Sequence, residues 1–284
     1  STAPSFARRA RELGVKGPVR VRVACPAKVN PFLAVGPKDE RGYHPIRTIF
    51  QAVSWFDYLT ISDEDEPGFY CDEVPDENTV TKALRLIGEY TALPPLHIRL
   101  EKHIPSESGL GGGSSDAAGL LRVIHFFALT KVPPAHLADV AYAVGMDVPF
   151  FLGGGRAKAT GYGEILSSLV DPDPTTRYVI VKPVIGVSSA QAYSRLDELS
   201  YPFLDIPTDD SVYNDIERVA PGQSLDLIER MITLGCIQAG LTGSGSAVFG
   251  VTTAMEAPRI ASDLSRYGLD PKVVQPIQQG EIEH

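Results

Sequence analysis

The sequence predicts an α+β protein that is built in two parts. Segments with the twofold alternation of strands are mixed with segments that carry a helical apolar face, without the strict strand–helix–strand order of a parallel α/β sheet. The chain of 284 residues is long for one domain, and the run DPDPTT (171–176) divides it. We therefore expect a tail over 1–18, a first domain over 19–172 and a second domain over 173–284.

The first domain begins with strands and continues with helices. Alternating Val and Arg at the start of 19–35 predict a strand, and 47–62 also has strand composition. Apolar residues at helical spacing predict a helix over 78–90, and alternation over 96–101 predicts another strand. A helix from about Ser114 is apolar around nearly its whole circumference. We expect that helix to run through the middle of its domain.

The second domain is expected to mix shorter elements of both kinds. The predicted strands are 178–187, 246–252 and 272–277, and the predicted helices are 190–199, 224–234 and 258–267.

Composition excludes several classes of protein. Hydrophobic residues make up 43% of the chain, which is enough for a core and excludes global disorder. A formal net charge of −9 disfavours nucleic-acid binding, so an anionic ligand must be held by a local device. Cys25, Cys71 and Cys236 lack metal-ligand spacing, which favours a reduced, cytoplasmic protein without structural zinc. No apolar run is long enough for a membrane span, and 1–18 lacks the core of a secretory signal.

The most informative segment is the glycine-rich loop PSESGLGGGSSDAA (105–118), which precedes the buried helix. Its glycines permit positive φ and a close approach of main-chain N–H groups to a ligand. Ser114, Ser115 and Asp116 are residue types that favour helix N-caps. Free N–H groups and the helix dipole at that point suit a phosphate. The loop is neither a Walker A nor a Rossmann motif, and a tight turn without a ligand is the alternative.

Other candidate residues are weaker signals when taken alone. The second glycine turn, LTGSGS (241–246), is explained equally well as a plain connection, and Gly153–Gly155 is expected to be only a turn. Lys28 is expected at the end of an apolar strand, flanked by Pro26 and Pro31, where a lysine extending from the strand edge is the alternative. Asp147 lies in GMDVPFF, where a turn or N-cap aspartate is the alternative.

Several segments together resemble the GHMP kinases. They are PAKVNPFLAV (26–35), GYHPIRTIFQAV (42–53), IPSESGLGGGSSDAA (104–118), GMDVPFFLGGGRAKATGYGE (145–164), Asn214-Asp215 and LTGSGSAVFG (241–250). The GYH and PAK-x-N segments resemble the branch that acts on a cytidylyl methylerythritol in the non-mevalonate isoprenoid pathway. Met146, Leu241 and a short stretch after Tyr193 depart from that pattern.

This resemblance implies a two-domain GHMP-kinase fold with the active site in the interdomain cleft. It implies ATP-dependent phosphorylation of the 2-hydroxyl group of that alcohol, with Mg²⁺ bridging the phosphates. Lys28 and Asp147 would be catalytic, and Ser115 is the first candidate for a Mg²⁺ ligand although no metal site is assigned. ATP would be bound by Asn78, Lys102, Pro105, Ser106, Glu107, Ser108, Gly109, Leu110, Gly111, Gly112, Gly113, Ser114 and Ser115. The alcohol would be bound by Asn30, Tyr43, His44, Tyr193, Gly243 and Ser244.

Two other functions stay open at this point. One is a GHMP kinase for another small alcohol, such as mevalonate, homoserine or a sugar, and the other is a catalytically silent nucleotide-binding protein. The GYH segment with Tyr193 favours a substrate with a flat base, and the presence of both Lys28 and Asp147 favours an enzyme. We expect a small-molecule substrate and neither a nucleic-acid nor a membrane partner.

Overall fold

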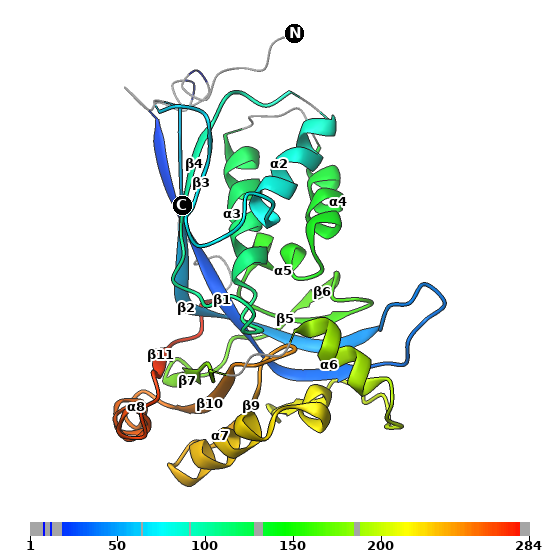
Figure 1. Ribbon diagram of the computed structural model, residues 1–284, viewed down its shortest axis with the longest axis vertical. Helices are drawn as coiled ribbons and strands as arrows, with labels where there is room; N and C mark the ends of the chain where they lie inside the picture. Colours follow the sequence, from blue (N-terminus) through cyan, green and yellow to red (C-terminus); the bar gives the residue numbers. More distant parts are fainter. Residues whose placement is uncertain are drawn as a thin grey trace.

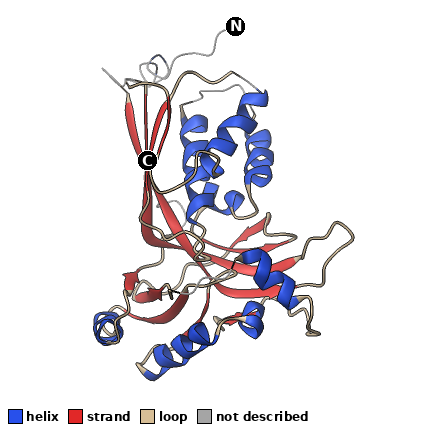
Figure 2. Cartoon of the chain, viewed as in Figure 1, coloured by secondary structure: helices blue, strands red, loops and turns tan. Residues whose placement is uncertain are grey.

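The computed structural model describes residues 19–63, 65–90, 92–127, 133–184 and 188–278, together with Arg8 and Glu12. Apart from those two residues, the predicted tail lies outside the described residues. Helices and strands are mixed in two bodies, each built around a sheet (Figures 1 and 2). The α+β class is confirmed.

A long antiparallel pair, β1 (Arg20–Val35) and β2 (Ile46–Ser62), forms the centre of a seven-stranded sheet. The order along the sheet is β3-β4-β2-β1-β8, with β5 pairing with β2 and β6 with β5. The remaining strands are β3 (Gly68–Tyr70), β4 (His97–Glu101), β5 (Arg156–Thr160), β6 (Ile165–Ser168) and β8 (Tyr213–Asn214). Strand β8 belongs to the second half of the chain, so the two halves share this sheet.

Helices cover one face of the upper part of this sheet (Figure 1). They are α2 (Thr79–Tyr90), α3 (Gly112–Phe126), α4 (Pro134–Val144) and α5 (Val148–Gly153). Helix α3 contacts both β1 and β2 and also the three other helices, and most of its side chains are buried. It therefore runs through the middle of the domain, as its apolar circumference predicts.

The second sheet is four-stranded and antiparallel, in the order β11-β7-β10-β9. Its strands are β7 (Thr176–Val181), β9 (Gln238–Leu241), β10 (Val248–Thr253) and β11 (Lys272–Val274). The accompanying helices are α6 (Ser189–Leu196), the short 3₁₀ helix η1 (Asp215–Val219), α7 (Gly222–Thr233) and α8 (Ala257–Arg266). Amphipathic α7 and α8 pack their apolar residues against this sheet.

A hydrophobic cluster joins the two sheets. Ala27 and Val29 of β1 pack with Ile180 of β7 and with Phe249 of β10, and all four side chains are fully buried. Because buried apolar side chains each contribute about 1.5–3 kcal/mol, this cluster ties the two bodies together. Among the described residues, no helix is long and apolar enough to cross a membrane.

Element boundaries differ from the sequence predictions in a few places. The predicted strand 178–187 begins at Thr176 and ends at Val181, and the predicted helix 190–199 ends at Leu196. The elements β3, α4, α5, β5, β6, β8, η1 and β9 have no counterpart among those expected from sequence. Most of them are short, and a short segment shows too few turns or alternations for its period to be recognised.

Candidate active site

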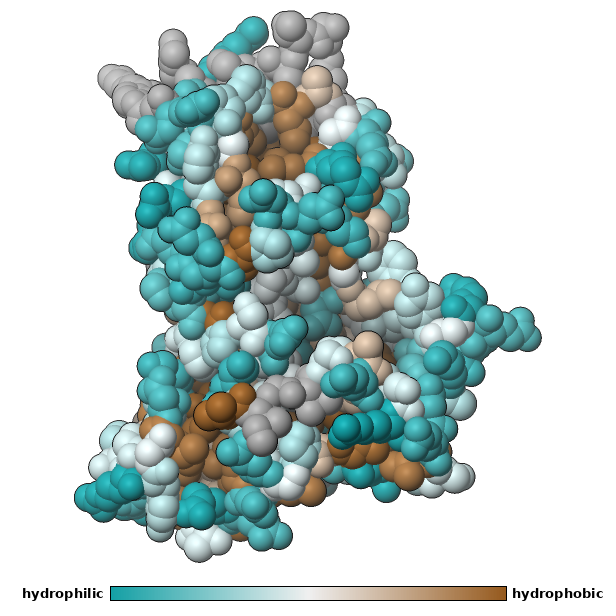
Figure 3. Space-filling view, viewed as in Figure 1, coloured by the Kyte–Doolittle hydropathy of each residue, from teal (hydrophilic) through white to brown (hydrophobic). Residues whose placement is uncertain are grey.

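A cavity of about 740 Å³ opens between the two bodies of the molecule. Figure 3 shows the molecule narrowing between the body that carries α2 to α5 and the body that carries α6 to α8. The first body contributes Lys28, Asn30, Asn78, Thr79, Lys102, most of the glycine-rich loop, Asp116 and Asp147. The second body contributes Ser188, Ser189, Tyr193, Gly243, Ser244 and Gly245.

Lys28 lies in the middle of β1, where its side chain is only 3% exposed. The pairing of β1 with β2 shifts register just before Ala27 and again after Val29. Such irregularities redirect side chains, and here Lys28 lines the cavity. The alternative of a lysine extending into solvent from a strand edge is therefore wrong.

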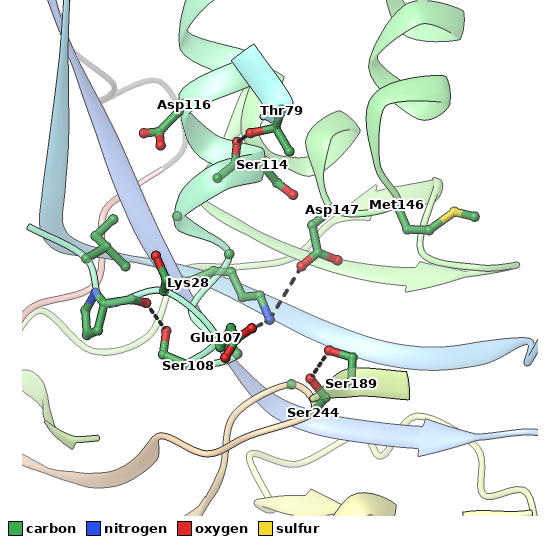
Figure 4. A pocket seen from close by; sticks show the side chains of 18 of the residues that line it. Lys28, Thr79, Glu107, Ser108, Ser114, Asp116, Met146, Asp147, Ser189 and Ser244 are labelled. Atoms are coloured by element: carbon green, nitrogen blue, oxygen red, sulfur yellow. Dashed lines mark hydrogen bonds and ion pairs between the residues drawn. The ribbon is translucent and has the colours of Figure 1, made fainter. Parts of the chain in front are cut away.

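Three acceptors surround the Lys28 ammonium group. Nζ donates to Asn30 Oδ1 at 2.5 Å and to the Gly109 carbonyl at 2.7 Å, and it lies 3.6 Å from Asp147 Oδ2. Figure 4 shows Asp147 and Lys28 directed toward each other. Burial lowers the pKa of Lys28, while the neighbouring Asp147 carboxylate acts in the opposite direction.

Asp147 occupies the N-cap position of α5, but its side chain makes no capping hydrogen bond. Its carboxylate is 30% exposed and pairs with Lys28. Asp147 therefore holds the N-cap position through its backbone, and its side chain takes no part in capping. The carboxylate faces both a buried cation and the open cavity.

The glycine-rich loop reaches α3 through Gly111, the N-cap residue, which has φ 73°. A Cβ on Gly111 would lie 2.9 Å from the Phe151 ring and 3.2 Å from Lys28 Cε, so glycine is required both by φ and by space. The left-handed turn brings the chain into the helix at Gly112. Residues 114–116 consequently lie inside the first turns, and the expectation that they cap the helix is wrong.

The second glycine turn is packed against this loop. The Ala247 N–H donates to the Ser108 carbonyl at 3.0 Å, and a Cβ on Gly109 would lie 2.1 Å from the Thr242 carbonyl oxygen. The Ser244 and Ser189 hydroxyls are 2.6 Å apart at the cavity wall (Figure 4). The turn is thus more than a connection, since it forms one wall of the cavity.

Comparison with known proteins places the chain in a family. Models of the GHMP kinases N terminal domain and of the GHMP kinases C terminal region match residues 78–155 and 218–270. A 4-diphosphocytidyl-2-C-methyl-D-erythritol kinase of Polaromonas naphthalenivorans (strain CJ2) is 33% identical over 255 residues, covering 80% of this chain and 84% of that protein. The chain belongs to the GHMP kinases. A relative with the same name from Chlorobium phaeobacteroides (strain BS1) is 34% identical over 269 residues, covering 85% and 91%.

Solved structures agree with this assignment. A structure described as 4-(cytidine 5'-diphospho)-2C-methyl-D-erythritol kinase has a TM-score of 0.76 at 32% identity, covering 90% of this chain and 99% of that chain. A mevalonate kinase shares the fold alone, with a TM-score of 0.63 at 13% identity, covering 91% and 100%. The chain is therefore an ATP-dependent phosphotransferase of the GHMP fold, and the predicted family and enzyme class are confirmed.

Most residues that the family resemblance implies for ATP line the cavity of this GHMP kinase, but two do not. The side chain of Leu110 is fully buried in the cluster between the sheets, and its carbonyl accepts a hydrogen bond from the Lys28 N–H at 2.9 Å. The Ser115 hydroxyl is fully buried and lacks a hydrogen-bond partner in the structure. Ser114 lines the cavity instead. The earlier helix start turns Ser115 inward, so the structure gives no support to Ser115 as the first candidate for Mg²⁺.

Only some of the residues that are expected to bind the alcohol line the cavity. Asn30, Tyr193, Gly243 and Ser244 line the cavity. The His44 ring lies 5.3 Å from the Tyr193 ring, with His44 Nε2 3.2 Å from Asp197. Tyr43 does not line the cavity.

Tyr43 is 57% exposed, and its ring meets the edge of Tyr162 at 6.0 Å. Its backbone N–H donates to Asp39 Oδ1, and this hydrogen bond helps to hold the turn that carries the ring. Tyr193 lines the cavity and Tyr43 does not, so the expectation that the two rings flank the same base stays a prediction.

A buried charge cluster lies behind the start of α3. Lys102 Nζ is 2.8 Å from Asp116 Oδ2 and also forms a very short contact with Asp57 Oδ2. Asp57 Oδ1 accepts the N–H groups of His103 and Ile104, which follow β4. Burial raises the pKa of Asp116 to about 7, although Lys102 opposes this change. The cluster therefore holds three elements of the cavity wall together.

The sequence predicts no role at the site for Thr79, and it predicts only a helix N-cap for Asp116. The Thr79 hydroxyl donates to the Gly113 carbonyl at 2.5 Å, and Asp116 lines the cavity behind the loop. An aspartate among the apolar residues of a buried helix was the available signal for Asp116, since such a charge requires a partner. No sequence pattern marks Thr79 or Thr242 in this way, because each of them contacts residues that are far away in the sequence.

Proposed function

We propose that this kinase transfers the γ-phosphoryl group of ATP to the 2-hydroxyl group of 4-diphosphocytidyl-2-C-methyl-D-erythritol, a step of the non-mevalonate isoprenoid pathway. The observation that carries the proposal is the Lys28–Asp147 pair, which faces a cavity with a glycine-rich loop on one wall. The names of relatives at 33–34% identity support the acceptor. Free cysteines at 25, 71 and 236 support a reducing, cytoplasmic setting.

The triphosphate of ATP is assigned to the glycine-rich loop. Gly111 and Gly112 bring main-chain N–H groups to the cavity at the beginning of α3, where the first helical N–H groups have no acceptor within the helix. The positive end of the α3 dipole adds to this attraction. The protein is acidic as a whole, but it can bind a polyanion here because the free N–H groups and the helix dipole act locally.

Mg²⁺ fits the donor set of the cavity. The Ser114 hydroxyl and the Glu107 carboxylate both line it and are hard oxygen ligands of the kind that Mg²⁺ prefers, so each would be a ligand for an ion bound beside it. The described residues contain no cluster of three or more metal-ligating side chains, which suits an ion that is held mainly by phosphates. When bound, Mg²⁺ would offset the charge of the β- and γ-phosphates.

Asp147 is assigned as the proton acceptor of the hydroxyl group. Its carboxylate is partly exposed to the cavity, so a hydroxyl group can approach it. Lys28 pairs with this carboxylate and would stabilise negative charge on the attacking oxygen. In a loose transition state the proton leaves late, so positioning matters more than strong basicity.

The cytidine end of the alcohol is assigned to the wall formed by Tyr193. Its ring lines the cavity and packs against the ring of His44, whose two nitrogens already contact the Gly36 carbonyl and Asp197, so Tyr193 itself offers the flat surface for a base. This wall favours a substrate with a base over a small aliphatic alcohol. We also propose domain limits of 19–172 and 173–284, with β8 of the second domain joining the sheet of the first.

An ADP-release assay with purified protein tests this function. ATP and Mg²⁺ are supplied with one of four acceptors: the cytidylyl alcohol, mevalonate, homoserine or a hexose. We expect turnover with the cytidylyl alcohol at a kcat/KM far above that with the others. Preference for another alcohol would replace the substrate, and ATP binding without turnover on any acceptor would support a silent nucleotide-binding protein.

A further inference from the structure

We propose that Thr242 is a positioning residue for the phosphoryl transfer and that it acts through the groups that hold the Lys28 ammonium. The inference rests on the proposed function, because it concerns the geometry of Lys28 and Asp147. Thr242 lies in the second glycine turn, and its side chain is completely buried. It belongs to the second half of the chain, whereas Lys28 belongs to the first.

The direction of the Lys28 ammonium is set by its acceptors. An ammonium group has three N–H donors, and three acceptors surround Nζ here. Two of them, Asn30 Oδ1 at 2.5 Å and the Gly109 carbonyl at 2.7 Å, lie close enough for strong hydrogen bonds. The third, Asp147 Oδ2, is 3.6 Å away. The first two acceptors therefore determine where the ammonium lies relative to Asp147.

The Thr242 hydroxyl touches both of these acceptors. Oγ1 accepts the Asn30 backbone N–H at 3.1 Å, and it lies 3.4 Å from Asn30 Oδ1 and 3.3 Å from the Gly109 carbonyl oxygen. A hydroxyl has one hydrogen, so it donates toward one of these two oxygens while accepting from Asn30. One buried hydroxyl thus fixes the spacing between the two groups that hold Lys28.

Thr242 is itself held independently of its hydroxyl. The Asn214 side-chain amide donates to the carbonyls of Leu241 at 2.8 Å and Gly243 at 2.9 Å, on either side of Thr242. Asn214 lies in β8, which pairs with β1. Removing only the hydroxyl should therefore leave the turn in place and release the acceptors.

Without the Thr242 hydroxyl, the oxygens of Asn30 and Gly109 would be held less firmly. The Lys28 ammonium that they bind would then move by tenths of an ångström. Asn30 would keep one anchor, because its side-chain amide donates to the Thr48 hydroxyl at 2.9 Å. Small displacements of groups around the reacting atoms lower the rate of the chemical step more than they lower substrate binding. The expected signature is a fall in kcat with little change in KM.

The first test compares Thr242→Val with Thr242→Ser. Valine keeps the shape and removes the hydroxyl, so kcat should fall by about 10- to 100-fold while KM for ATP changes by less than about threefold. Serine keeps the hydroxyl and should retain most of the activity. Thr252→Val is the matched control, since Thr252 is a buried threonine of β10 that does not line the cavity. If Thr242→Val does not fold, Thr242→Ala takes its place.

The second test asks whether Thr242 acts through Lys28. In a Lys28→Met background, Thr242→Val should cause no further loss of kcat, because the group that it positions is absent. A further loss as large as in the wild-type background would overturn the proposal, and so would equal damage from Thr242→Val and Thr242→Ser.

The third test does not depend on the substrate. Acetic anhydride labelling, read by mass spectrometry, measures the reactivity of Lys28 against that of exposed Lys158 in the same sample. Displaced acceptors form weaker hydrogen bonds and stabilise the charged ammonium less, so Thr242→Val should raise Lys28 labelling severalfold. Unchanged labelling would overturn the proposal. Raised labelling in a protein that does not phosphorylate the cytidylyl alcohol would refute the proposed function and leave the role of Thr242 standing.

Discussion

At the scale of single residues, Lys28 is where the contacts of the cavity converge. It touches the glycine-rich loop through Gly109, the neighbouring Asn30 and the carboxylate of Asp147. A buried lysine costs free energy unless acceptors surround it, and these partners supply that compensation. A lysine maintained in this environment is suited to electrostatic work on a substrate.

Replacement of Asp147 tests its assigned role as proton acceptor. Asp147→Asn keeps the shape and removes the charge, so kcat should fall on the order of 10²–10⁴-fold with KM for ATP little changed. Lys28→Met should lose activity comparably, and the double variant should be far from additive. Steady-state kinetics and melting temperatures are measured together, with Asp226→Asn on the exposed side of α7 as the control. A stable Asp147→Asn enzyme with wild-type turnover would contradict the assignment.

The conformation of Gly111 gives a prediction about ATP. Gly111→Ala places a Cβ 2.9 Å from the Phe151 ring at a φ of 73°, so the N–H groups behind it must move. We expect the affinity for ATP to fall tenfold or more, about 1.4 kcal/mol, in a protein that still folds. Gly88→Ala is the control, because a Cβ at Gly88 of α2 meets nothing within 4 Å. Calorimetric titration with unchanged affinity for Gly111→Ala would remove the loop from the site.

Tyr193 gives a prediction about the acceptor. Removal of its ring should cost about 1–3 kcal/mol of stacking, which appears as a raised KM for the cytidylyl alcohol with ATP affinity nearly unchanged. Tyr193→Phe should keep most of the affinity. Tyr43→Ala should have the smaller effect, because that ring does not line the cavity. A larger effect at Tyr43 than at Tyr193 would show that the turn carrying Tyr43 closes over the substrate.

At the scale of elements, the cavity depends on how α3, β2 and the end of β4 meet. Lys102 lies between Asp57 of β2 and Asp116 of α3, so one buried cation bridges two carboxylates. Two carboxylates and one ammonium leave an excess negative charge if all three are ionised. The structure reduces this cost by raising the pKa of Asp116 to about 7 through burial.

This cluster predicts a pH-dependent stability. Between about pH 4 and pH 7 the folded protein retains a proton on Asp116 that the unfolded chain releases, since the ordinary pKa is 3.8. The free energy of unfolding should therefore decrease as the pH rises through that interval. Asp116→Asn should make the decrease smaller. Guanidinium unfolding at pH 5 and pH 8 measures it, and equal pH dependence in both proteins would show that Asp116 does not titrate there.

At the scale of the whole molecule, the two bodies are joined by more than a linker. Strand β8 of the second half pairs with β1, and the cluster of Val29, Ile180 and Phe249 fills the space between the sheets. The cavity is completed by side chains from both bodies. A site of this kind exists only when both bodies are folded together.

The shared core predicts cooperative unfolding. Because exposing either body would also expose the common cluster, both should unfold in one transition. Calorimetry should give equal calorimetric and van't Hoff enthalpies, and a fragment covering residues 173–284 alone should lack a stable fold. Two resolved transitions would show that each body has a sufficient core of its own.

Local patterns in the sequence were sufficient for the elements with a clear period. Alternation in 19–35, the helical spacing in 78–90 and the apolar circumference of α3 each predict an element that the structure contains. The glycine-rich and PAK-x-N segments identify the family in the same way, because a motif consists of residues that are close together in the sequence. Periodicity and motifs are local properties, and the sequence alone determines them.

Contacts between distant residues were decided by the tertiary structure. Gly111 rather than a polar side chain caps α3, so Ser115 turns inward and Ser114 lines the cavity. The burial of Lys28 depends on two register shifts between β1 and β2, which no composition rule predicts. Thr242 reaches Asn30 across 212 positions of the chain. Chain sequence determines which segments form, whereas packing determines which side chains meet, because it depends on the positions of all the segments at once.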